Sequence, residues 1–281
     1  MKFNIVLALP PEDRESFVHA QCFLETADLL RYGLEDLGYE VIFGEGLRRD
    51  HLNIILGYQF LYGQKIPSEY KCIVYQLEEL SELEGWPLEN LETLMSPSCV
   101  VWDFSERNID FLAERGIRAV LKPLGFHQKM FRIKYRQNKD VDILFYGSKN
   151  ERRMKILNEL EQKFNVKILC GIYGHERDEW IARSKIVLSI YYYQTKLFDD
   201  VRIGYLVNNK SFSIIEDSPN KKYDDFLVYI PYEQLVERCE YYLNNDDLRR
   251  EKARQAFQGF RNYPESKFLK HAYILFESRI I

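Results

Sequence analysis

The fold of this chain is decided by residues 141–217, which open with VDILFYGSKNERRMKIL and close with YYYQTKLFDDVRIGYLVNNKSFSIIED. An apolar run, Val141 to Phe145, predicts a buried strand that breaks at small residues and leads into a helix. A second apolar run, KIVLSIYYY, precedes a polar loop and another helical pattern. Backbone N–H groups and the helix dipole point at such strand-to-helix turns and favour anions there. The two turns therefore predict the two walls of a nucleotide-diphosphate site in a Rossmann-type domain.

Outward from this stretch, short apolar runs alternate with amphipathic helical patterns along the chain. The first half holds the runs NIVLAL, EVIFGE, LNIILGY, KCIVYQLE, SCVVWDF and RAVLKPLGF. Helical spacing extends from Glu15 to Leu37 and recurs over SERNIDFLAERG. The polar and basic segment 127–140, HQKMFRIKYRQNKD, predicts a linker between two domains, 1–126 and 141–262. The alternation predicts the α/β class with parallel sheets.

Composition and charge exclude several classes of protein. The chain has 281 residues, 46% hydrophobic and 29% charged, which suffices for the core of one or two soluble domains. A net charge of −4 argues against a general nucleic-acid binder. The five scattered cysteines form no CxxC pair, so we expect neither a disulfide framework nor a zinc site, and a cytoplasmic location. The N-terminal apolar run is too short for a signal peptide. No apolar run reaches the roughly 18–20 residues that span a bilayer, so any membrane contact is expected to be peripheral.

The chain resembles the bacterial glycosyltransferase-like proteins of the GT-B fold in three strings, FYGSKNERRMKIL, GIYGHERDEWIARSKIVLSIYYY and FDDVRIGYLVNN. More narrowly, it resembles the glycosyl transferase group 1 and CgeB-like relatives. The resemblance extends, less specifically, to NIILGYQFL, IVYQLEEL, VWDFSERNIDFL and KPLGF. It implies two facing Rossmann-like domains, with the acceptor against 1–126 and the activated sugar held by 141–262. It also implies that a helix in 263–281 returns to the N-terminal domain.

The chain departs from the usual GT-B pattern at three points. Many GT-B transferases place one glutamate in the loop and a second on the following helix, where the second holds the ribose of the nucleotide. Asp199 matches the first position best, and Tyr205 falls near the second. Tyr191 replaces the relatives' histidine at the end of the third strand of the C-terminal domain, and no Gly-rich loop follows the first strand of the chain.

The turn after the strand at 141–145 supplies the first donor candidates, Gly147, Ser148, Arg152 and Arg153. Glycosyl transfer leaves a nucleotide phosphate with extra negative charge, which fixed cations and N–H donors stabilise. Arginine stays charged and binds phosphate oxygens through a bidentate fork. Adjacent helix residues point about 100° apart, so we expect one of the two arginines to be merely solvated. The alternative is a helix with a basic exposed face.

Two further loops are candidates for donor binding. Asp199, Asp200 and Arg202 open a helix, where the carboxylates could accept from sugar or ribose hydroxyls or serve only as caps. Tyr173 and Gly174 follow another strand, and the carboxyl ends of parallel strands line the ligand crevice. Tyr173 is expected to stack on a base.

His19 and Glu78 are the candidates for the catalytic base. In some inverting GT-B transferases a histidine after the first strand deprotonates the acceptor, and His19 falls in this region. Glu78 follows the strand in KCIVYQLE. A lone histidine on a helix and a glutamate in an acidic run are both commonly surface residues. Weaker candidates are Asp13, Arg14, Glu15, Glu79 and Asp103.

Together these features predict a glycosyltransferase that moves a sugar from a nucleotide-activated donor to a glycan or glycoconjugate acceptor. The resemblance suggests a bacterial surface polysaccharide. No cofactor besides the nucleotide-sugar donor is expected, and no metal site, because no DxD triplet stands in a suitable context. Two alternatives stay open: another nucleotide-sugar enzyme such as an epimerase or hydrolase, and a non-catalytic nucleotide-sugar-binding protein.

Overall fold

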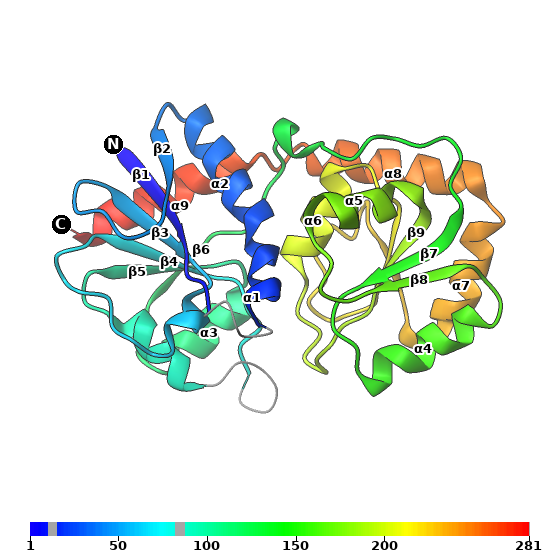
Figure 1. Ribbon diagram of the computed structural model, residues 1–281, viewed down its shortest axis with the longest axis horizontal. Helices are drawn as coiled ribbons and strands as arrows, with labels where there is room; N and C mark the ends of the chain where they lie inside the picture. The colour runs from blue at the N-terminus through cyan, green and yellow to red at the C-terminus, as the bar shows by residue number, and fades with distance from the viewer. Residues whose placement is uncertain (11–15, 82–87, 281) are drawn as a thin grey trace. The chain divides into compact units, whose positions relative to one another are not determined.

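The computed structural model describes residues 1–10, 16–81 and 88–280, which form two compact units (Figure 1). Unit 1 comprises Met1–His127 and Tyr263–Ile281, and unit 2 comprises Gln128–Asn262. Unit 2 is thus one continuous segment, whereas unit 1 is built from both ends of the sequence.

Unit 1 contains a parallel sheet with the strand order β2-β1-β3-β4-β5-β6. The two central strands, β3 and β4, are buried along their whole length, as expected of parallel strands covered on both faces. The strands confirm the six apolar runs of the first half, although Pro123 follows closely on β6 and leaves it short. Their bounds are β1 (Lys2–Leu7), β2 (Glu40–Gly44), β3 (Leu52–Leu56), β4 (Cys72–Gln76), β5 (Cys99–Asp103) and β6 (Ala119–Leu121).

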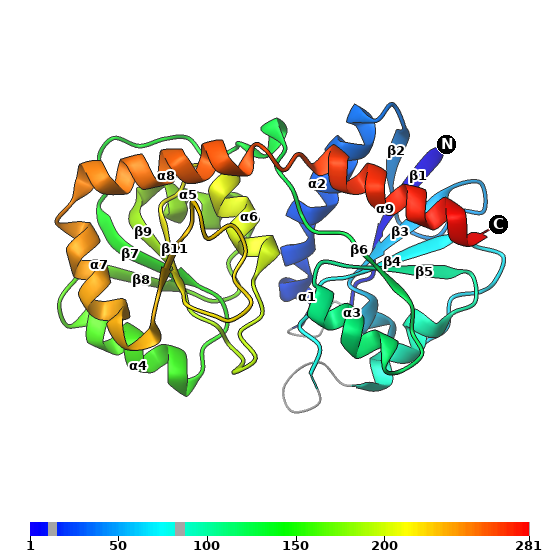
Figure 2. The same ribbon diagram turned by 180° about the vertical axis from the view of Figure 1, so that it is seen from behind.

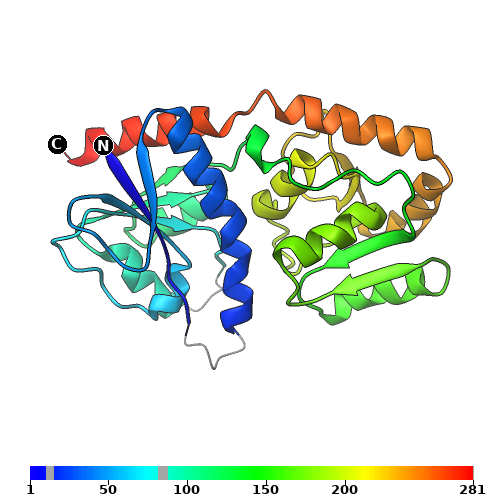
Figure 3. The same ribbon diagram turned by 45° about the horizontal axis from the view of Figure 1, so that its top comes forward.

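Helices α2 (Leu24–Asp36) and α9 (Glu265–Ile280) pack together on one face of this sheet, and α3 (Glu106–Ala113) lies on the other (Figure 3). The helix expected from Glu15 to Leu37 is broken. A short α1 (Ser16–His19) and the 3-10 turn η1 (Ala20–Phe23) precede α2. Two further 3-10 segments, η2 (Tyr58–Leu61) and η3 (Leu88–Met95), follow β3 and precede β5.

A fully buried ion pair ties α9 to the rest of unit 1. The Lys122 ammonium contacts the Glu265 carboxylate, and both side chains have an exposed fraction of 0%. The other Glu265 oxygen accepts from the Gly125 backbone N–H at 2.7 Å. Beside this pair, Phe126 donates to the Tyr263 carbonyl at 2.8 Å and accepts from the Glu265 N–H at 2.8 Å. The two points where the chain leaves and re-enters unit 1 are therefore bonded to each other.

Unit 2 contains a second parallel sheet, in the order β11-β10-β9-β7-β8. Helices α4 and α7 cover one face and α5 and α6 the other (Figure 2). The core on the α4 and α7 side is built from Ile143, Leu157 and Leu188, which are fully buried. The bounds are β7 (Val141–Tyr146), α4 (Glu151–Glu161), β8 (Val166–Leu169), α5 (Gly174–Arg183), β9 (Ser184–Ser189), α6 (Asp200–Asn208), β10 (Ser213–Glu216), β11 (Val228–Ile230), η5 (Tyr232–Gln234), α7 (Leu235–Leu243) and α8 (Asp246–Phe260).

Within the segment 127–140, residues 128–140 belong to unit 2 and pack onto it. The segment contains the 3-10 turn η4 (Gln128–Met130), and Met130 and Ile133 are buried. The backbone N–H groups of Arg132 and Ile133 both donate to the Asn209 side chain, at 2.7 and 2.9 Å. Although its sequence is basic and only weakly periodic, this segment makes specific backbone hydrogen bonds.

Two parallel sheets with alternating helices confirm the predicted α/β class.

Candidate functional site

Unit 2 has a topological switch point between β7 and β9. The chain runs from β7 outward to β8 on one side and from β9 outward to β10 on the other. In open α/β sheets, ligands bind in the crevice outside the carboxyl ends of the strands at such a point. Here Gly147 and Ser148 follow β7, and Ile190 to Tyr192 follow β9. The predicted anion turn therefore lies where the topology favours a ligand.

Two capped helices begin at this edge of the sheet. The Asn150 side chain accepts from the Arg153 N–H at 2.9 Å and donates to the Tyr192 carbonyl at 2.9 Å, so it both caps α4 and ties the two loops together. The Asp199 carboxylate caps α6 by accepting from the Arg202 N–H at 3.0 Å. The N-terminal ends of both helices carry positive partial charge. Asp199 thus caps α6, which is one of the two roles that the sequence suggested for it.

Two guanidinium groups, those of Arg153 and Arg202, converge on Gly147. A Cβ built on Gly147 would lie 2.9 Å from Nη2 of Arg202 and 3.6 Å from Nη1 of Arg153. Gly147 has φ of +134°, a conformation that favours glycine. Glycine at this position leaves the space into which both cations point.

Arg153 is held rigidly and lacks a carboxylate partner. Its Nε donates to the Ile190 carbonyl at 2.9 Å and its Nη1 to the Ser148 carbonyl at 2.7 Å. It is buried and forms no ion pair within the described ranges. Burial, together with the neighbouring Arg202 guanidinium, lowers the pKa of Arg153. A bound anion would offset both effects.

Arg202 completes the pair of cations. Its Nε lies 3.3 Å from the Asp199 carboxylate, and its guanidinium carbon lies 4.9 Å from the centre of the Tyr146 ring. The side chain is 15% exposed, so part of it remains reachable from solvent. Among the described residues, Asp199 is the one carboxylate that pairs with these two arginines.

Arg152 has a different role from Arg153. It forms a two-point ion pair with Glu216, whose side chain is fully buried. It also donates to the Tyr191 carbonyl at 3.1 Å and lies over the Tyr232 ring at 4.1 Å. The expectation that one of the two arginines is merely solvated is wrong, because both are fixed by protein groups. Glu216 already neutralises Arg152.

Glu216 is a site residue that sequence reasoning missed. It ends β10, accepts from the Tyr191 N–H at 3.1 Å, and pairs with Lys196 at 2.8 Å as well as with Arg152. The signal available in the sequence was an acidic residue at the end of an apolar strand, in SFSIIED. Tyr191, expected in place of a histidine, is buried and contributes backbone atoms to this network.

The loop after β8 holds the remaining donor candidates. Tyr173 directly precedes α5, and Gly174 begins it with φ of +57° and with open space where a Cβ would lie. Tyr205, which falls near the second glutamate position, is buried and donates to the Asp178 carboxylate at 2.6 Å. The hydroxyl of Tyr205 therefore donates its hydrogen bond to a residue of α5.

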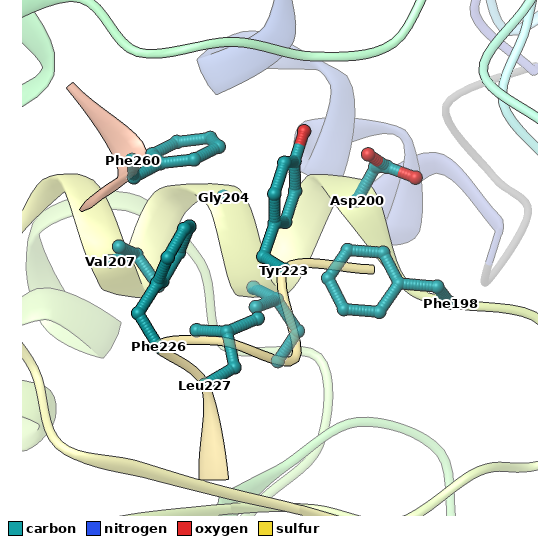
Figure 4. Close-up of a pocket in the computed structure, with 9 residues that line it drawn as sticks. Phe198, Asp200, Gly204, Val207, Tyr223, Phe226, Leu227 and Phe260 are labelled. Carbon is teal, nitrogen blue, oxygen red and sulfur yellow. The ribbon is translucent and has the colours of Figure 1, made fainter. Parts of the chain in front are cut away.

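Asp200 belongs to a separate cluster. It is buried and pairs with Lys222 at 2.6 Å. Figure 4 shows it beside an aromatic group that includes Tyr223, whose ring stacks on Phe226 at 5.5 Å. The space among these side chains does not admit a water molecule. Asp200 therefore stabilises the packing on α6.

In unit 1, Glu78 lies in a polar network at the carboxyl ends of β4 and β5. Gln59 donates to the Glu78 carboxylate at 2.9 Å, and Gln76 donates to the buried Asp103 carboxylate at 2.7 Å. Burial and the charges of Glu78 and Asp103 raise the pKa of the Tyr58 hydroxyl. Glu78 is thus a partly buried and oriented carboxylate.

His19, the other candidate base, ends α1 and is exposed. The weaker candidates Asp13, Arg14 and Glu15 lie outside the described residues. Among the residues described, no group of three His, Cys, Asp or Glu side chains is placed to hold a metal ion. None of the described helices combines the length and apolar character needed to cross a membrane.

No family model matches the chain. Two uncharacterized proteins of Acanthamoeba polyphaga mimivirus are similar in sequence. One is 28% identical over 195 residues, which is 66% of this chain and 66% of that protein. The other is 24% identical over 190 residues, 64% of this chain and 56% of that protein. The chain therefore spans less than two thirds of the length of these relatives. Both are viral, so the bacterial part of the resemblance stays a prediction.

Two solved structures share the fold. One is AviGT4, a glycosyltransferase involved in avilamycin A biosynthesis, with a TM-score of 0.57 and 14% identity over 98% of this chain and 96% of that chain. The other is TarM, with a TM-score of 0.59 and 11% identity over 92% of this chain and 58% of that chain. The fold is that of GT-B glycosyltransferases. Identities this low show the fold alone.

Proposed function

We propose that the chain is a glycosyltransferase that binds a nucleotide-sugar donor at the carboxyl edge of unit 2 and transfers its sugar to a glycan acceptor. The observation that carries this proposal is the convergence of Arg153 and Arg202 on Gly147 at the switch point. The shared fold with glycosyltransferases supports it.

The two arginines suit the leaving group of the reaction. When the glycosidic bond to the donor breaks, negative charge develops on the nucleotide phosphate, and preorganised cations stabilise that charge most. Arg153 is fixed by the Ile190 and Ser148 carbonyls before any ligand arrives, so little reorganisation is needed. Because the guanidinium groups supply this stabilisation, the transfer proceeds without a bound metal ion in our proposal.

The neighbouring groups would orient the donor. Gly147 leaves room for a phosphate oxygen, and the N-termini of α4 and α6 add partial positive charge. Tyr173 is proposed to stack on the base of the nucleotide. The Asp199 carboxylate is proposed to accept a hydrogen bond from a hydroxyl of the donor, using lone pairs that do not take part in its capping bond. Arg152 is proposed to fix the loop after β9 through Glu216 rather than to bind phosphate.

In unit 1 we propose Glu78 as the base that takes the proton of the acceptor hydroxyl. Its carboxylate is oriented by Gln59 at 2.9 Å, whereas His19 is exposed at the end of a single helical turn. A positioned general base contributes about 10²- to 10⁴-fold to a rate. Glu78→Gln should therefore lower kcat by at least about 10²-fold, and His19→Asn should leave it within a factor of a few.

Nucleotide binding tests the donor site. A panel of UDP, GDP, ADP, CMP and dTDP, with their common sugar conjugates, is screened by calorimetry and thermal shift. A ligand at about a hundred times its Kd stabilises the native state by about 2.7 kcal/mol, so one nucleotide should give a clear shift. Arg202→Gln and Arg153→Lys should weaken its binding at least about tenfold, since each removes part of a charge-assisted contact.

The matched control is Lys155→Gln, which removes an exposed cation from the same helix as Arg153 and should bind normally. Retained nucleotide affinity in Arg202→Gln would contradict the site. Binding without sugar transfer to any acceptor pool would favour the non-catalytic alternative, and donor turnover without acceptor would favour an epimerase or hydrolase.

A further inference from the structure

Unit 2 contains a cavity of about 670 Å³ at the edge of its sheet opposite to the proposed donor site. Its lining comes from six places: the segment 131–139, the end of α5, the start of β9, the loop between α6 and β10, the end of α7, and α8. All six belong to unit 2. The volume falls within the range of about 300–1,000 Å³ that is typical of small-molecule sites.

The cavity is separate from the proposed donor site. Lys139 lines it and stands just before β7, whereas Gly147 stands just after that strand. A strand of six residues spans about 20 Å. Because all strands of the sheet are parallel, the cavity lies at their amino ends, where the switch-point rule predicts no ligand.

One wall of the cavity is apolar. Side chains of Ile181, Ala182 and Ala253 line it, and all three are buried. Phe212 and Leu243 add to this apolar surface. An occupant would therefore bury an apolar group.

The lining also carries a marked excess of positive charge. It includes the basic residues Lys134, Lys139, Lys185, Lys210, Arg249, Arg250 and Arg254, whereas Asp246 is the only carboxylate among the described residues that line it. Asp246 is shared by Arg249 and Arg250, each at 2.6 Å.

Two more lining cations have carboxylate partners outside the cavity lining. Lys185 pairs with Asp142 and Arg254 with Glu251, each at 2.7 Å. Lys134, Lys139 and Lys210 form no ion pair in the part of the chain that the structure describes. The lining is thus short of negative charge by several units.

The shortage of negative charge affects Lys139 in particular. Its ammonium donates to the Ser184 carbonyl at 2.7 Å and is partly buried. Burial, with the nearby charges of Arg249 and Arg250, lowers its pKa to about 8. Arg249 itself is 5% exposed. A cation held inside the protein beside other cations is stabilised by a bound anion.

We propose that this cavity binds a small organic phosphate that carries an apolar group. The phosphate lies among Lys134, Lys139 and Lys210, and the apolar group lies on the buried wall formed by Ile181, Ala182 and Ala253. The ligand is a molecule that enters from solution. It occupies a site independent of the donor nucleotide.

Calorimetry with octyl phosphate, below the concentration at which it forms micelles, tests the proposal. We expect one molecule bound per chain. Methyl phosphate lacks the apolar group and octyl glucoside lacks the charge, so each should bind at least about tenfold more weakly. Raising the salt concentration should weaken binding of octyl phosphate because part of the attraction is between charges.

The double variant Lys134→Glu/Lys210→Glu should lower the affinity for octyl phosphate at least about tenfold. Both side chains are exposed, so the fold should survive, and circular dichroism checks this. Lys155→Glu makes the same change of charge on α4, away from the cavity, and should bind normally. Arg202→Gln should also bind octyl phosphate normally, which separates this site from the proposed donor site.

Three results would overturn the proposal. The first is unchanged affinity in the double variant, which would place the anion elsewhere. The second is no binding of octyl phosphate to the folded wild-type chain. The third is binding to vesicles that contain phosphatidic acid without binding to soluble octyl phosphate, which would identify a membrane surface instead of a small molecule. None of these results bears on nucleotide binding at Arg153 and Arg202.

Discussion

Arg152 and Glu216, which are 64 residues apart in the sequence, form a two-point ion pair at the carboxyl edge of unit 2. The side chains are 16% and 0% exposed. Because Glu216 also accepts from the Tyr191 backbone, the pair links the first turn of α4, the end of β9 and the end of β10. It supports the loops from which Arg153 takes its backbone partners.

Removing the charge of Glu216 should therefore destabilise unit 2. Glu216→Gln leaves Arg152 and Lys196 without their carboxylate, and breaking a buried pair from one side costs about 3–5 kcal/mol. Denaturant unfolding measures the loss. Glu159→Gln, an exposed glutamate on α4, should change stability by less than about 0.5 kcal/mol. Equal effects of the two substitutions would show that the pair is not a structural support.

Gly147→Ala should remove nucleotide binding and lower stability. The added Cβ would lie 2.9 Å from Arg202 Nη2, and the residue has φ of +134°. Backbone strain of this kind costs about 1–3 kcal/mol. Gly204→Ala in α6 is the control, since the nearest atom to its Cβ would be Cζ of Phe260, at an ordinary contact distance of 3.6 Å. It should stabilise the chain by about 0.5–1 kcal/mol. Full nucleotide affinity in Gly147→Ala would place the phosphate elsewhere.

Lys122→Met should loosen α9. The substitution leaves the Glu265 carboxylate fully buried with the Gly125 N–H as its remaining donor, and we expect a loss of about 3–5 kcal/mol. Hydrogen exchange should increase first in the N-terminal half of α9. Lys65→Met, at an exposed position of unit 1, should leave exchange in α9 unchanged. Uniform exchange across unit 1 in Lys122→Met would contradict a local anchor.

The stability of the chain should depend on the titration of Lys139. Its pKa in the folded state is lowered to about 8, chiefly by burial, so between pH 8 and about 10.4 the unfolded state binds more protons. Stability contributed by this group therefore rises with pH across that window, and its penalty is fully present below pH 8. From pH 8 to 10, the unfolding free energy of wild type should therefore increase relative to that of Lys139→Met. A difference that is constant with pH would contradict the assigned environment.

The strands could be predicted from the sequence because each is a short apolar run bounded by turn residues. The long first helix was predicted as one piece, since a 3-10 turn such as Ala20–Phe23 keeps nearly the same apolar spacing as an α-helix. The strand-to-helix turn at Gly147 could be predicted as well, because strand, glycine and helix follow one another directly.

The separate roles of Arg152 and Arg153 could not be predicted. Neighbouring side chains on a helix point about 100° apart. The sequence therefore indicates that Arg152 and Arg153 point in different directions, but it does not indicate which of them faces the turn. The difference depends on Glu216, which lies 64 residues from Arg152 in the sequence and which β10 brings to the end of β9. The pairing of Arg202 with Arg153 likewise depends on strand order, which a single sequence leaves open.

The bonded junction at Phe126 and Tyr263 has a consequence for how the chain can be cut. Residues 128–262 form an insertion whose two ends emerge from hydrogen-bonded neighbours. Excising them and joining residue 127 to 263 through a few glycines should leave unit 1 a closed fold, and the excised piece should fold as a separate protein. The nucleotide-binding test could then be repeated on 135 residues alone, since Arg153, Arg202 and Gly147 would all travel with the piece from Gln128 to Asn262.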